Sequence, residues 1–383
     1  MKSKILFNAL GIQDSGGISV LIKTLSELKI STRYKIYVFL YRNSKTTDIG
    51  DHYIESTNID IIYVNNKSFI YRLLFENIYY YYFFRKYNID IIYNFSGSAQ
   101  IFYRKHQLVK IQNILFYSKT LDAIYLSNNK YFEWIKKVKA KRYIFLLMLR
   151  SVKYIEIQSE HVKLNVGDFL SIENVRMFVK SDFIVSKREL CEPKKYRLSE
   201  KITILYIVGP HYNLQHKNIE DFIYSMSQLE NYNIDYEIKI TLSREQLKEY
   251  PSWKNELDSR TQYLGYISHE KIIQLFQDNC ILISTSIIET LGLHVIEAII
   301  NGVIAIVPEL NYSACVYGND VRTYKLFDPE SLSSEIINVI HMDEKEVKIT
   351  ISKNQEYLFN SEHSKHRSIL HVFDIIQKEN NYV

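Results

Sequence analysis

The sequence predicts two consecutive α/β domains, each a Rossmann-like, doubly wound parallel sheet, that face a common cleft. Its 383 residues exceed the size of one ordinary domain and suit two. Short runs rich in Ile, Val, Tyr and Phe alternate with helical stretches, as is typical of parallel strands buried between layers of helices. The alternation occurs in two series, which a polar stretch at residues 186–201 separates.

The first series predicts strands at residues 4–10, 34–40, 59–64, 89–95, 108–112, 154–158 and 175–179. The hexapeptide Asn-Ile-Asp-Ile-Ile-Tyr occurs at residues 58–63 and again at 88–93. Because this spacing is one strand-helix unit, we interpret the repeat as one local solution used twice and not as a solenoid.

The second series predicts strands at residues 202–208, 236–241, 262–264, 281–284 and 303–307, with helices at 218–229, 268–277 and 291–300. A closing helix is expected at residues 363–378. We therefore expect an N-terminal domain over residues 1–190, a C-terminal domain over 191–362, and a closing segment over 363–383.

Composition narrows the class of protein. Hydrophobic residues make up 46% and charged residues 24%, as in a soluble globular chain. Cys191, Cys280 and Cys315 are too scattered for a disulfide framework or a zinc site, and Cys280 is expected in the core. Residues 1–180 hold 27 basic and 14 acidic residues, whereas the remainder holds 21 and 29. The basic first half predicts an anionic surface as its partner.

The first candidate site is the turn Gly11-Ile-Gln-Asp-Ser-Gly-Gly17, which follows the first strand and opens a helix. Gly16 and Gly17 would let a phosphate approach the backbone at the positive end of the helix dipole. A tight turn without a ligand explains the glycine pair equally well.

The second candidate is Lys217, which lies before a helix at the carboxyl end of a predicted strand. Ligands of open α/β sheets bind at that position, and a lysine there can hold a diphosphate. The commoner fate of a single lysine is a solvated loop.

The third candidate is the segment from Ser284 to Glu297, which carries Glu289 at the end of a loop. Thr290, Leu291 and Gly292 are expected to open a helix and to turn their N–H groups toward an anion. Glu297 lies among apolar residues of that helix, where a carboxylate is costly without partners. Two adjacent ribose hydroxyls would satisfy it, and so would an ion pair with a Lys or Arg.

This segment resembles the Glu-x7-Glu motif of retaining glycosyltransferases of the family 4 type, which have the two-domain GT-B fold. The resemblance covers nearly the whole chain, and further motifs carry it: Gly16-Gly17, Gln112-Asn113, Gln158-Ser159, Lys217-Asn218, Gly265-Tyr266, Asn301–Pro308 and Phe327–Pro329.

The resemblance implies a role for each matched residue. Lys217 would neutralise the leaving diphosphate, together with Gly16, Gly17 and the amides from Thr290 to Gly292. Glu289 and the neighbouring Ser286 would lie on the donor-sugar side, and Asn113 on the sugar or acceptor side. Glu297 would hold the ribose, and the backbone near Gly265 and Tyr266 the base.

The resemblance also implies retaining transfer from a nucleotide-diphosphate sugar, with no cofactor and no metal. The domain over residues 1–190 would then bind the acceptor and the domain over 191–362 the nucleotide sugar, with the closing helix crossing back to the N-terminal domain. The acceptor would be a glycan or a polyprenyl-diphosphate-linked glycan, in O-antigen, capsule or other surface-polysaccharide assembly. One departure concerns the second diphosphate cation: many relatives have Gly-Arg where this chain has Gly209-Pro210. His211, His216 or a basic residue of the N-terminal domain could replace that Arg, or Lys217 could act alone.

Two segments combine aromatic and basic residues. Residues 70–87 are expected to pack on the N-terminal sheet. For residues 130–153, packing and peripheral contact with an anionic membrane are equally good explanations. With no signal peptide and no spanning segment in the sequence, we expect a cytoplasmic protein, at the inner face of the membrane if that contact exists. No nucleic-acid recognition motif is present.

Two other functions fit the same fold. A non-catalytic sugar-nucleotide-binding partner subunit would explain Pro210, but Glu289, Glu297 and Lys217 speak against it. A nucleotide-sugar epimerase is disfavoured by the Glu-x7-Glu spacing. Release of nucleotide diphosphate distinguishes the transferase from the partner subunit, because fold alone does not decide function.

Overall fold

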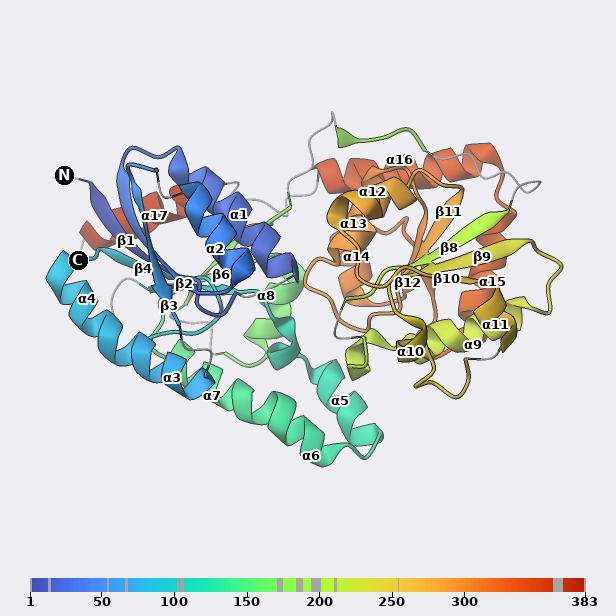
Figure 1. The fold of residues 1–383 in the computed structure, drawn as a ribbon, viewed down its shortest axis with the longest axis horizontal. Helices are drawn as coiled ribbons and strands as arrows, with labels where there is room; N and C mark the ends of the chain where they lie inside the picture. The colour runs from blue at the N-terminus through green and yellow to red at the C-terminus, as the bar shows by residue number, and fades with distance from the viewer. Residues whose placement is uncertain are drawn as a thin grey trace. The chain divides into compact units, whose positions relative to one another are not determined.

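A computed structural model of the chain describes residues 2–12, 15–53, 55–65, 68–101, 103, 107–170, 175–183, 189–193, 201–209, 212–253, 255–360 and 368–381. The chain forms two compact units (Figure 1). Unit 1 comprises residues 1–182 and 363–383, and unit 2 comprises residues 183–362. The first unit thus ends after Asp182, whereas the sequence suggested residue 190, and the closing segment belongs to unit 1.

Unit 1 is built on a seven-stranded parallel sheet in the order β3-β2-β1-β4-β5-β6-β7. All seven predicted strands of this half are present. Their bounds are β1 Ser3–Asn8, β2 Tyr34–Tyr41, β3 Ile59–Val64, β4 Ile91–Asn94, β5 Gln107–Ile111, β6 Tyr154–Ile157 and β7 Arg176–Val179.

The helices of unit 1 include two single π-helical turns, η1 and η3, within longer helical stretches, and one short 3-10 helix, η2. Their bounds are α1 Ser15–Lys29, α2 Ser44–Tyr53, α3 Phe69–Leu74, η1 Phe75–Tyr79, α4 Tyr80–Tyr87, η2 Ile114–Tyr117, α5 Lys119–Ser127, α6 Tyr131–Trp134, η3 Ile135–Lys139, α7 Ala140–Leu149, α8 Glu160–Gly167 and α17 Ile369–Asn381.

Alternate residues of β1 supply the cores on the two faces of this sheet. Ile5 and Phe7 pack in the core that includes residues of α1 and α17, whereas Leu6 packs with Tyr80 and Phe83 of α4. Both faces are therefore apolar, which explains why the strand sequences show no polar alternation.

Helix α17 crosses back to unit 1, as predicted. Figure 1 shows this red helix beside the blue elements of the N-terminal sheet. The Ile369 N–H donates to Glu27 Oε1 of α1 at 2.7 Å, and the Tyr34 hydroxyl donates to Asp374 at 2.5 Å. Phe373 is fully buried, so the last helix completes the core of the first unit.

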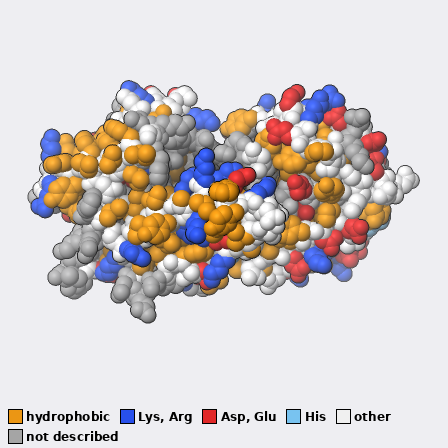
Figure 2. All heavy atoms as spheres, turned by 90° about the horizontal axis from the view of Figure 1, so that it is seen from below, with side chains coloured by type: hydrophobic (Ala, Val, Ile, Leu, Met, Phe, Trp, Pro, Cys, Tyr) orange, Lys and Arg blue, Asp and Glu red, His pale blue; other side chains and the backbone are white. Residues whose placement is uncertain are grey.

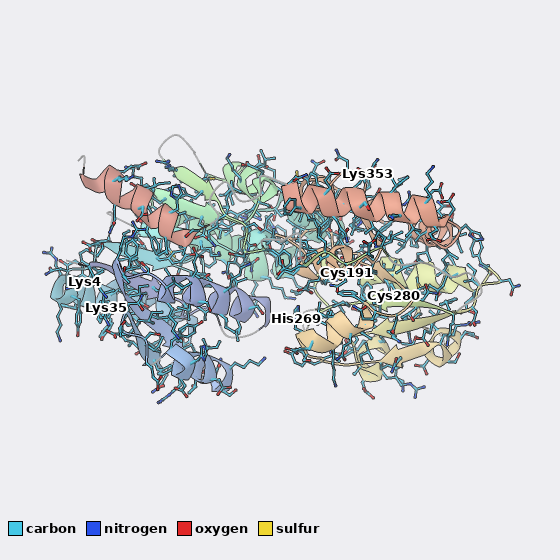
Figure 3. All side chains as sticks on the ribbon, turned by 90° about the horizontal axis from the view of Figure 1, so that it is seen from above. Lys4, Lys35, Cys191, His269, Cys280 and Lys353 are labelled. Atoms are coloured by element: carbon cyan, nitrogen blue, oxygen red, sulfur yellow. The ribbon has the colours of Figure 1, made fainter. Side chains whose placement is uncertain are left out.

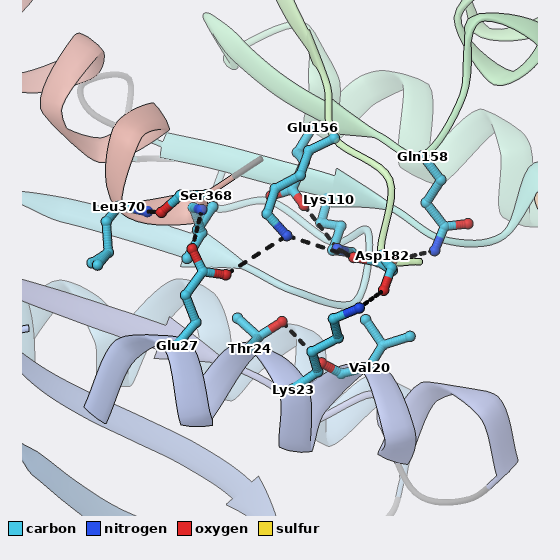
Figure 4. Close-up of polar contacts among 12 residues, drawn as sticks. Val20, Lys23, Thr24, Glu27, Lys110, Glu156, Gln158, Asp182, Ser368 and Leu370 are labelled. Carbon is cyan, nitrogen blue, oxygen red and sulfur yellow. Dashed lines mark hydrogen bonds and ion pairs between the residues drawn. The ribbon is translucent and has the colours of Figure 1, made fainter. Parts of the chain in front are cut away.

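A cluster of charged side chains lies buried beside β5 and β6 (Figure 4). Lys110 Nζ is 2.7 Å from Glu156 Oε1 and also forms an ion pair with Asp182. Gln158 donates its amide to Asp182, and Lys23 Nζ donates to the Asp182 carbonyl at 2.8 Å. Because Asp182 ends the first of the two segments that make up unit 1, these contacts hold the point at which the chain first leaves that unit.

Unit 2 is a six-stranded parallel sheet in the order β10-β9-β8-β11-β12-β13. The five predicted strands are present, and the sequence did not predict the sixth, β13, which lies at the edge of the sheet. The bounds are β8 Ile202–Tyr206, β9 Tyr236–Ile240, β10 Thr261–Tyr263, β11 Cys280–Ile283, β12 Ala305–Pro308 and β13 Arg322–Tyr324.

The helices of unit 2 cover both faces of its sheet, with separate cores on the two sides. Their bounds are η6 Gln215–Lys217 (a 3-10 helix), α9 Ile219–Leu229, α10 Arg244–Leu247, α11 Asn255–Ser259, α12 His269–Leu275, α13 Leu293–Ile300, α14 Asn311–Tyr317, α15 Pro329–Ile340 and α16 Glu344–Asn360. None of the three cysteines forms a disulfide, and Cys280, labelled in Figure 3, is buried in the core as expected.

Candidate functional site

The candidate site of unit 2 lies between β8 and β11, where the order of the strands along the sheet reverses. Strands β8 and β11 are neighbours at the centre of the sheet, with Cys280 opposite Thr203 and Ile283 opposite Tyr206. The chain leaves β8 toward Lys217 and leaves β11 toward Glu289. Ligands of doubly wound sheets bind at this switch point, at the carboxyl ends of the strands.

Lys217 and Glu289 meet there as an ion pair. Lys217 Nζ is 2.6 Å from Glu289 Oε1 and 3.3 Å from Ser286 Oγ. The two side chains are only 18% and 17% exposed. Burial by itself would raise the pKa of Glu289, but the charge of Lys217 and its hydrogen bond lower it to about 2. Glu289 is therefore a carboxylate at neutral pH.

Hydrogen bonds join the two loops that carry this pair. The Thr285 hydroxyl donates to the Lys217 carbonyl at 2.7 Å, and the Ile287 N–H donates to the His216 carbonyl at 2.7 Å. The Tyr206 hydroxyl lies 2.7 Å from Thr285 Oγ1, which links the loops to β8. These contacts hold the backbone of Lys217 beside the loop that carries Glu289.

Helix α13 begins two residues later than the sequence suggested, at Leu293, and Gly292 is its N-cap. Thr290 and Leu291 lie in the preceding turn. Gly292 has φ +57°, and a Cβ at this position would lie 2.0 Å from the Tyr317 hydroxyl. Only glycine fits here, because any side chain would meet both the φ penalty and the buried tyrosine.

Glu297 faces a histidine and not the Lys or Arg considered above. His269 Nε2, at the start of α12 in Figure 3, is 2.9 Å from Glu297 Oε1. His269 is 63% exposed and Glu297 only 15%. Burial raises the pKa of Glu297, and His269 opposes that rise. Glu297 is thus a mostly buried side chain that, among the described residues, pairs with an exposed histidine ring.

Gly265 and Tyr266 lie in the turn that leads to His269. Gly265 has φ +59°, and its N–H donates to the Leu242 carbonyl at 3.4 Å. Tyr266 is mostly exposed. Because His269 contacts Glu297, the segment that follows this turn lies beside the middle of α13.

In unit 1 the residues of the first candidate turn border a cavity of about 210 Å³. It opens at the carboxyl ends of β1, β4 and β5 and is lined by Gly11, Ile12, Ser96, Gly97, Ile111, Gln112, Asn113, Phe116, Tyr117 and Phe145. Ser96 Oγ and Gln112 Nε2 are buried with no hydrogen-bond partner in the described part of the chain. A Cβ on Gly11 would lie 2.5 Å from the Ser96 side chain, so the first strand needs glycine at this turn.

The predicted residues of unit 1 have local structural explanations. Gly16 and Gly17 lie in the first turn of α1, with Gly17 packed near Ile12. Asn113 caps η2, because its Oδ1 accepts the Leu115 N–H at 3.0 Å. Gln13, Asp14, Pro210 and His211 lie outside the described residues, so the missing Arg at Pro210 stays a feature of the sequence alone.

Sequence reasoning missed His269 and His294. His294 Nε2 lies 3.1 Å from Ser284 Oγ, and burial lowers the pKa of His294 to about 4. The only signal in the sequence was that His294 lies inside the Glu-x7-Glu segment. Within the described residues, no cluster of three or more His, Cys, Asp or Glu side chains could hold a metal ion.

The low pKa of His294 predicts a pH-dependent stability of unit 2. Between pH 6.5 and about 4 the unfolded chain binds a proton at His294 that the folded chain does not. The free energy of unfolding should therefore fall as the pH drops through this window, by up to about 3 kcal/mol. Thermal unfolding across pH should show a smaller decline for His294→Gln than for wild type. The exposed His341→Gln is the control, and an equal decline in both variants would contradict the prediction.

Segment 130–153 packs partly on the rest of unit 1. Arg142 is buried and pairs with Asp122 at 2.7 Å, and the Trp134 indole N–H donates to the same carboxylate at 2.7 Å. Tyr131, Phe132, Tyr143 and Leu147 remain exposed. Among the described helices, none combines the length and apolar character needed to cross a membrane.

Residues 192–355 match the model of the family Glycosyl transferases group 1. This range lies inside unit 2 and contains the whole Lys217–Glu297 site. A search of curated protein sequences finds no match.

Solved structures resemble the whole chain. HepE from Anabaena, in complex with UDP and glucose, has a TM-score of 0.62 at 14% identity over 100% of both chains. Sucrose-phosphate synthase from Thermosynechococcus elongatus has a TM-score of 0.67 at 13% identity over 100% of both. WaaG, a glycosyltransferase involved in lipopolysaccharide biosynthesis, has a TM-score of 0.64 at 9% identity over 93% of this chain and 95% of that one. The predicted fold, two Rossmann-like domains of the GT-B type, is confirmed.

Proposed function

We propose that this chain is a glycosyltransferase that moves a sugar from a nucleotide-diphosphate sugar to a glycan or lipid-linked glycan, with retention of anomeric configuration. The observation that carries the proposal is the Lys217–Glu289 ion pair at the switch point of unit 2, within the range that matches Glycosyl transferases group 1. A lysine and a carboxylate held together there supply one group for a diphosphate and one for sugar hydroxyls.

In the proposed reaction the bond between the anomeric carbon and the phosphate oxygen breaks, and its electron pair leaves with the nucleotide diphosphate. The acceptor hydroxyl forms the new bond and loses its proton. Lys217 would donate to the departing phosphate, together with the amides of Thr290, Leu291 and Gly292. Glu289, ionised at neutral pH, would accept hydrogen bonds from the sugar, with Ser286 beside it.

Glu297 would anchor the ribose, with its exposed partner His269 moving aside or sharing the carboxylate. Gly265 and Tyr266 would contact the base. In unit 1 the residues Gly16 and Gly17 would approach the donor phosphate, and Asn113 would serve the sugar or acceptor. No metal is part of this mechanism, since the charged groups of unit 2 would stabilise the leaving group themselves.

The proposed setting is the assembly of a surface polysaccharide such as O-antigen or capsule, on a polyprenyl-diphosphate-linked acceptor at the inner face of the cytoplasmic membrane. The likeness to WaaG, named for lipopolysaccharide biosynthesis, supports this setting. So do the exposed Tyr131, Phe132 and Tyr143 within the basic segment 130–153, which would contact the membrane.

The direct test is release of nucleotide diphosphate. The purified chain is incubated with UDP-, GDP-, ADP- or CMP-sugars and lipid or glycan acceptors, after thermal shift has identified the nucleotide that binds. Acceptor-dependent release is expected with one donor. Nucleotide binding without release from any donor and acceptor would favour the alternative, a non-catalytic partner subunit, for which Pro210 in place of the expected Arg speaks.

Two substitutions separate the proposed roles of the glutamates. Glu297→Ala should raise the Kd for nucleotide about 10- to 100-fold, because it removes charge-assisted hydrogen bonds to the ribose. Glu289→Ala should mainly slow transfer and leave nucleotide affinity nearly unchanged. Calorimetry and transfer kinetics measure the two effects. The exposed Glu330→Ala is the control, and wild-type behaviour of both site variants would refute the assignment.

A further inference from the structure

The helical stretch from α3 through η1 to α4 has an apolar outer side. Ile70, Leu74, Ile78 and Tyr82 are 69%, 56%, 54% and 68% exposed. Tyr71, Tyr79 and Tyr81 flank this row and are also exposed. We call these seven residues the α3–α4 face. Figure 1 shows α3 and α4 along the outer edge of unit 1.

The inner side of the same stretch packs as the sequence suggested. Tyr80 and Phe83 are buried in the core beside β1 and β2. The centroid of the Phe39 ring lies 4.7 Å from that of Tyr80 and 5.1 Å from that of Phe83. The expectation that residues 70–87 simply cover the sheet is therefore correct for one side only. A contiguous row of exposed aliphatic and aromatic side chains marks a surface that another protein or a membrane covers.

The π-turn keeps the exposed residues in one row. Four residues make slightly more than one turn of an α-helix, so side chains spaced by four shift gradually around the helix axis. In the wider π-helical turn over Phe75–Tyr79 four residues make slightly less than one turn, so the shift there is in the opposite direction. Ile70, Leu74, Ile78 and Tyr82 consequently stay on the outer side along the whole stretch. The tyrosines beside them combine an apolar ring with a hydroxyl, which suits a boundary between lipid and water.

Charge identifies what covers this face. Within residues 68–87 the only acidic residue is Glu76. Its side chain is fully buried, and its Oε1 lies 3.0 Å from Arg72 Nε. Arg85 and Lys86 are exposed at the end of α4. In Figure 2, unit 1 shows extensive hydrophobic surface with Lys and Arg groups around it and few acidic groups. No exposed acidic residue within residues 68–87 balances Arg85 and Lys86, and anionic headgroups would complement them.

We propose that the α3–α4 face lies in the interface of an anionic lipid bilayer, with the aliphatic row in the acyl boundary and Arg85 and Lys86 at the headgroups. It is a contact separate from the one proposed for residues 130–153. Only the biological role of this contact rests on the proposed function, because the contact would bring unit 1 to a lipid-linked acceptor. Its physical basis is independent of catalysis.

The experiment is co-sedimentation of the full chain with vesicles of phosphatidylcholine, alone or mixed with phosphatidylglycerol. Ile70→Gln/Leu74→Gln/Ile78→Gln should reduce partitioning at least about tenfold, because three aliphatic side chains no longer enter the bilayer. Arg85→Gln/Lys86→Gln should reduce it about tenfold on mixed vesicles and not on neutral ones. Ile349→Gln/Phe359→Gln, similarly exposed on α16, is the matched control and should bind as wild type.

Thermal unfolding is the control for folding. The variants should unfold at the wild-type temperature, because the substituted side chains are exposed. Unchanged partitioning of the triple variant would overturn the proposal, as would loss of binding only in Tyr131→Gln/Phe132→Gln. A wild-type dimer that the triple variant converts to monomer in sedimentation would assign the face to a second copy and also overturn it. Vesicle binding without any nucleotide diphosphate release would refute the proposed function and leave this surface standing.

Discussion

Lys217→Ala is expected to lower the rate of sugar transfer about 100- to 1000-fold, the effect typical of removing one preorganised donor from a developing negative charge. The substitution also removes the ion pair of Glu289, because Lys217 Nζ lies 2.6 Å from Glu289 Oε1 in the wild-type structure. The pKa of Glu289 should therefore rise from about 2, and the free energy of unfolding of unit 2 should fall. Transfer kinetics and urea unfolding measure the two losses.

A double variant separates catalysis from stability. Lys217→Ala/Glu289→Gln removes both charges, so the stability lost in the single variant should largely return while transfer stays slow. Lys217→Arg keeps a cation and should retain part of the rate. If Lys217→Ala transfers sugar at the wild-type rate, Lys217 does not neutralise the leaving group.

The second large effect is expected in unit 1, at the buried charges of Figure 4. Lys110→Met should lower the free energy of unfolding by about 3–5 kcal/mol, because it leaves Glu156 without its cation in the core and Asp182 with only the more distant Lys180, whose Nζ is 3.9 Å from Asp182 Oδ1. Lys110 and Glu156 are fully buried. Burial alone would lower the pKa of Lys110, but Asp182 and Glu156 raise it above its ordinary value, so the lysine is charged.

Urea unfolding followed by circular dichroism measures this loss. Lys110→Met/Glu156→Gln/Asp182→Asn, which removes all three charges, should recover most of the stability. Lys353→Met removes an exposed lysine that pairs with Asp320 at 2.8 Å and should change stability by less than about 1 kcal/mol. Equal stability of Lys110→Met and Lys353→Met would show that the buried cluster is not a stabilising network.

The site was predictable to the extent that its chemistry is local in sequence. The segment from Ser284 to Glu297 carries Glu289, Gly292 and Glu297 within fourteen positions, and Lys217 follows a recognisable strand. His269 could not be predicted, because it lies 28 residues before Glu297 and meets it only through the packing of α12 against α13. The buried partners Thr285 and Tyr206 are likewise joined only by the sheet.

The repeated hexapeptide shows most directly what the sequence by itself determined. The first copy, at residues 58–63, forms β3 from Ile59 onward, and the last three residues of the second copy, at 88–93, enter β4. Because β-branched and aromatic residues favour a pleated backbone, a strand at both places was predictable from the residues alone. Two α/β units and the positions of most of their strands were predicted in the same local way, whereas the return of the last helix to unit 1 was expected from the resemblance to the GT-B fold.

Only the tertiary structure decided the surroundings of each copy. The first became β3, at the edge of the sheet, where Tyr63 donates to the Thr47 carbonyl and stays partly exposed. The second became β4, at the centre, where Tyr93 is fully buried and donates to Glu156 at 2.6 Å. Identical residues differ because burial and partners come from strands distant in sequence, and the same physics brought Lys217 to Glu289 and left the α3–α4 face uncovered.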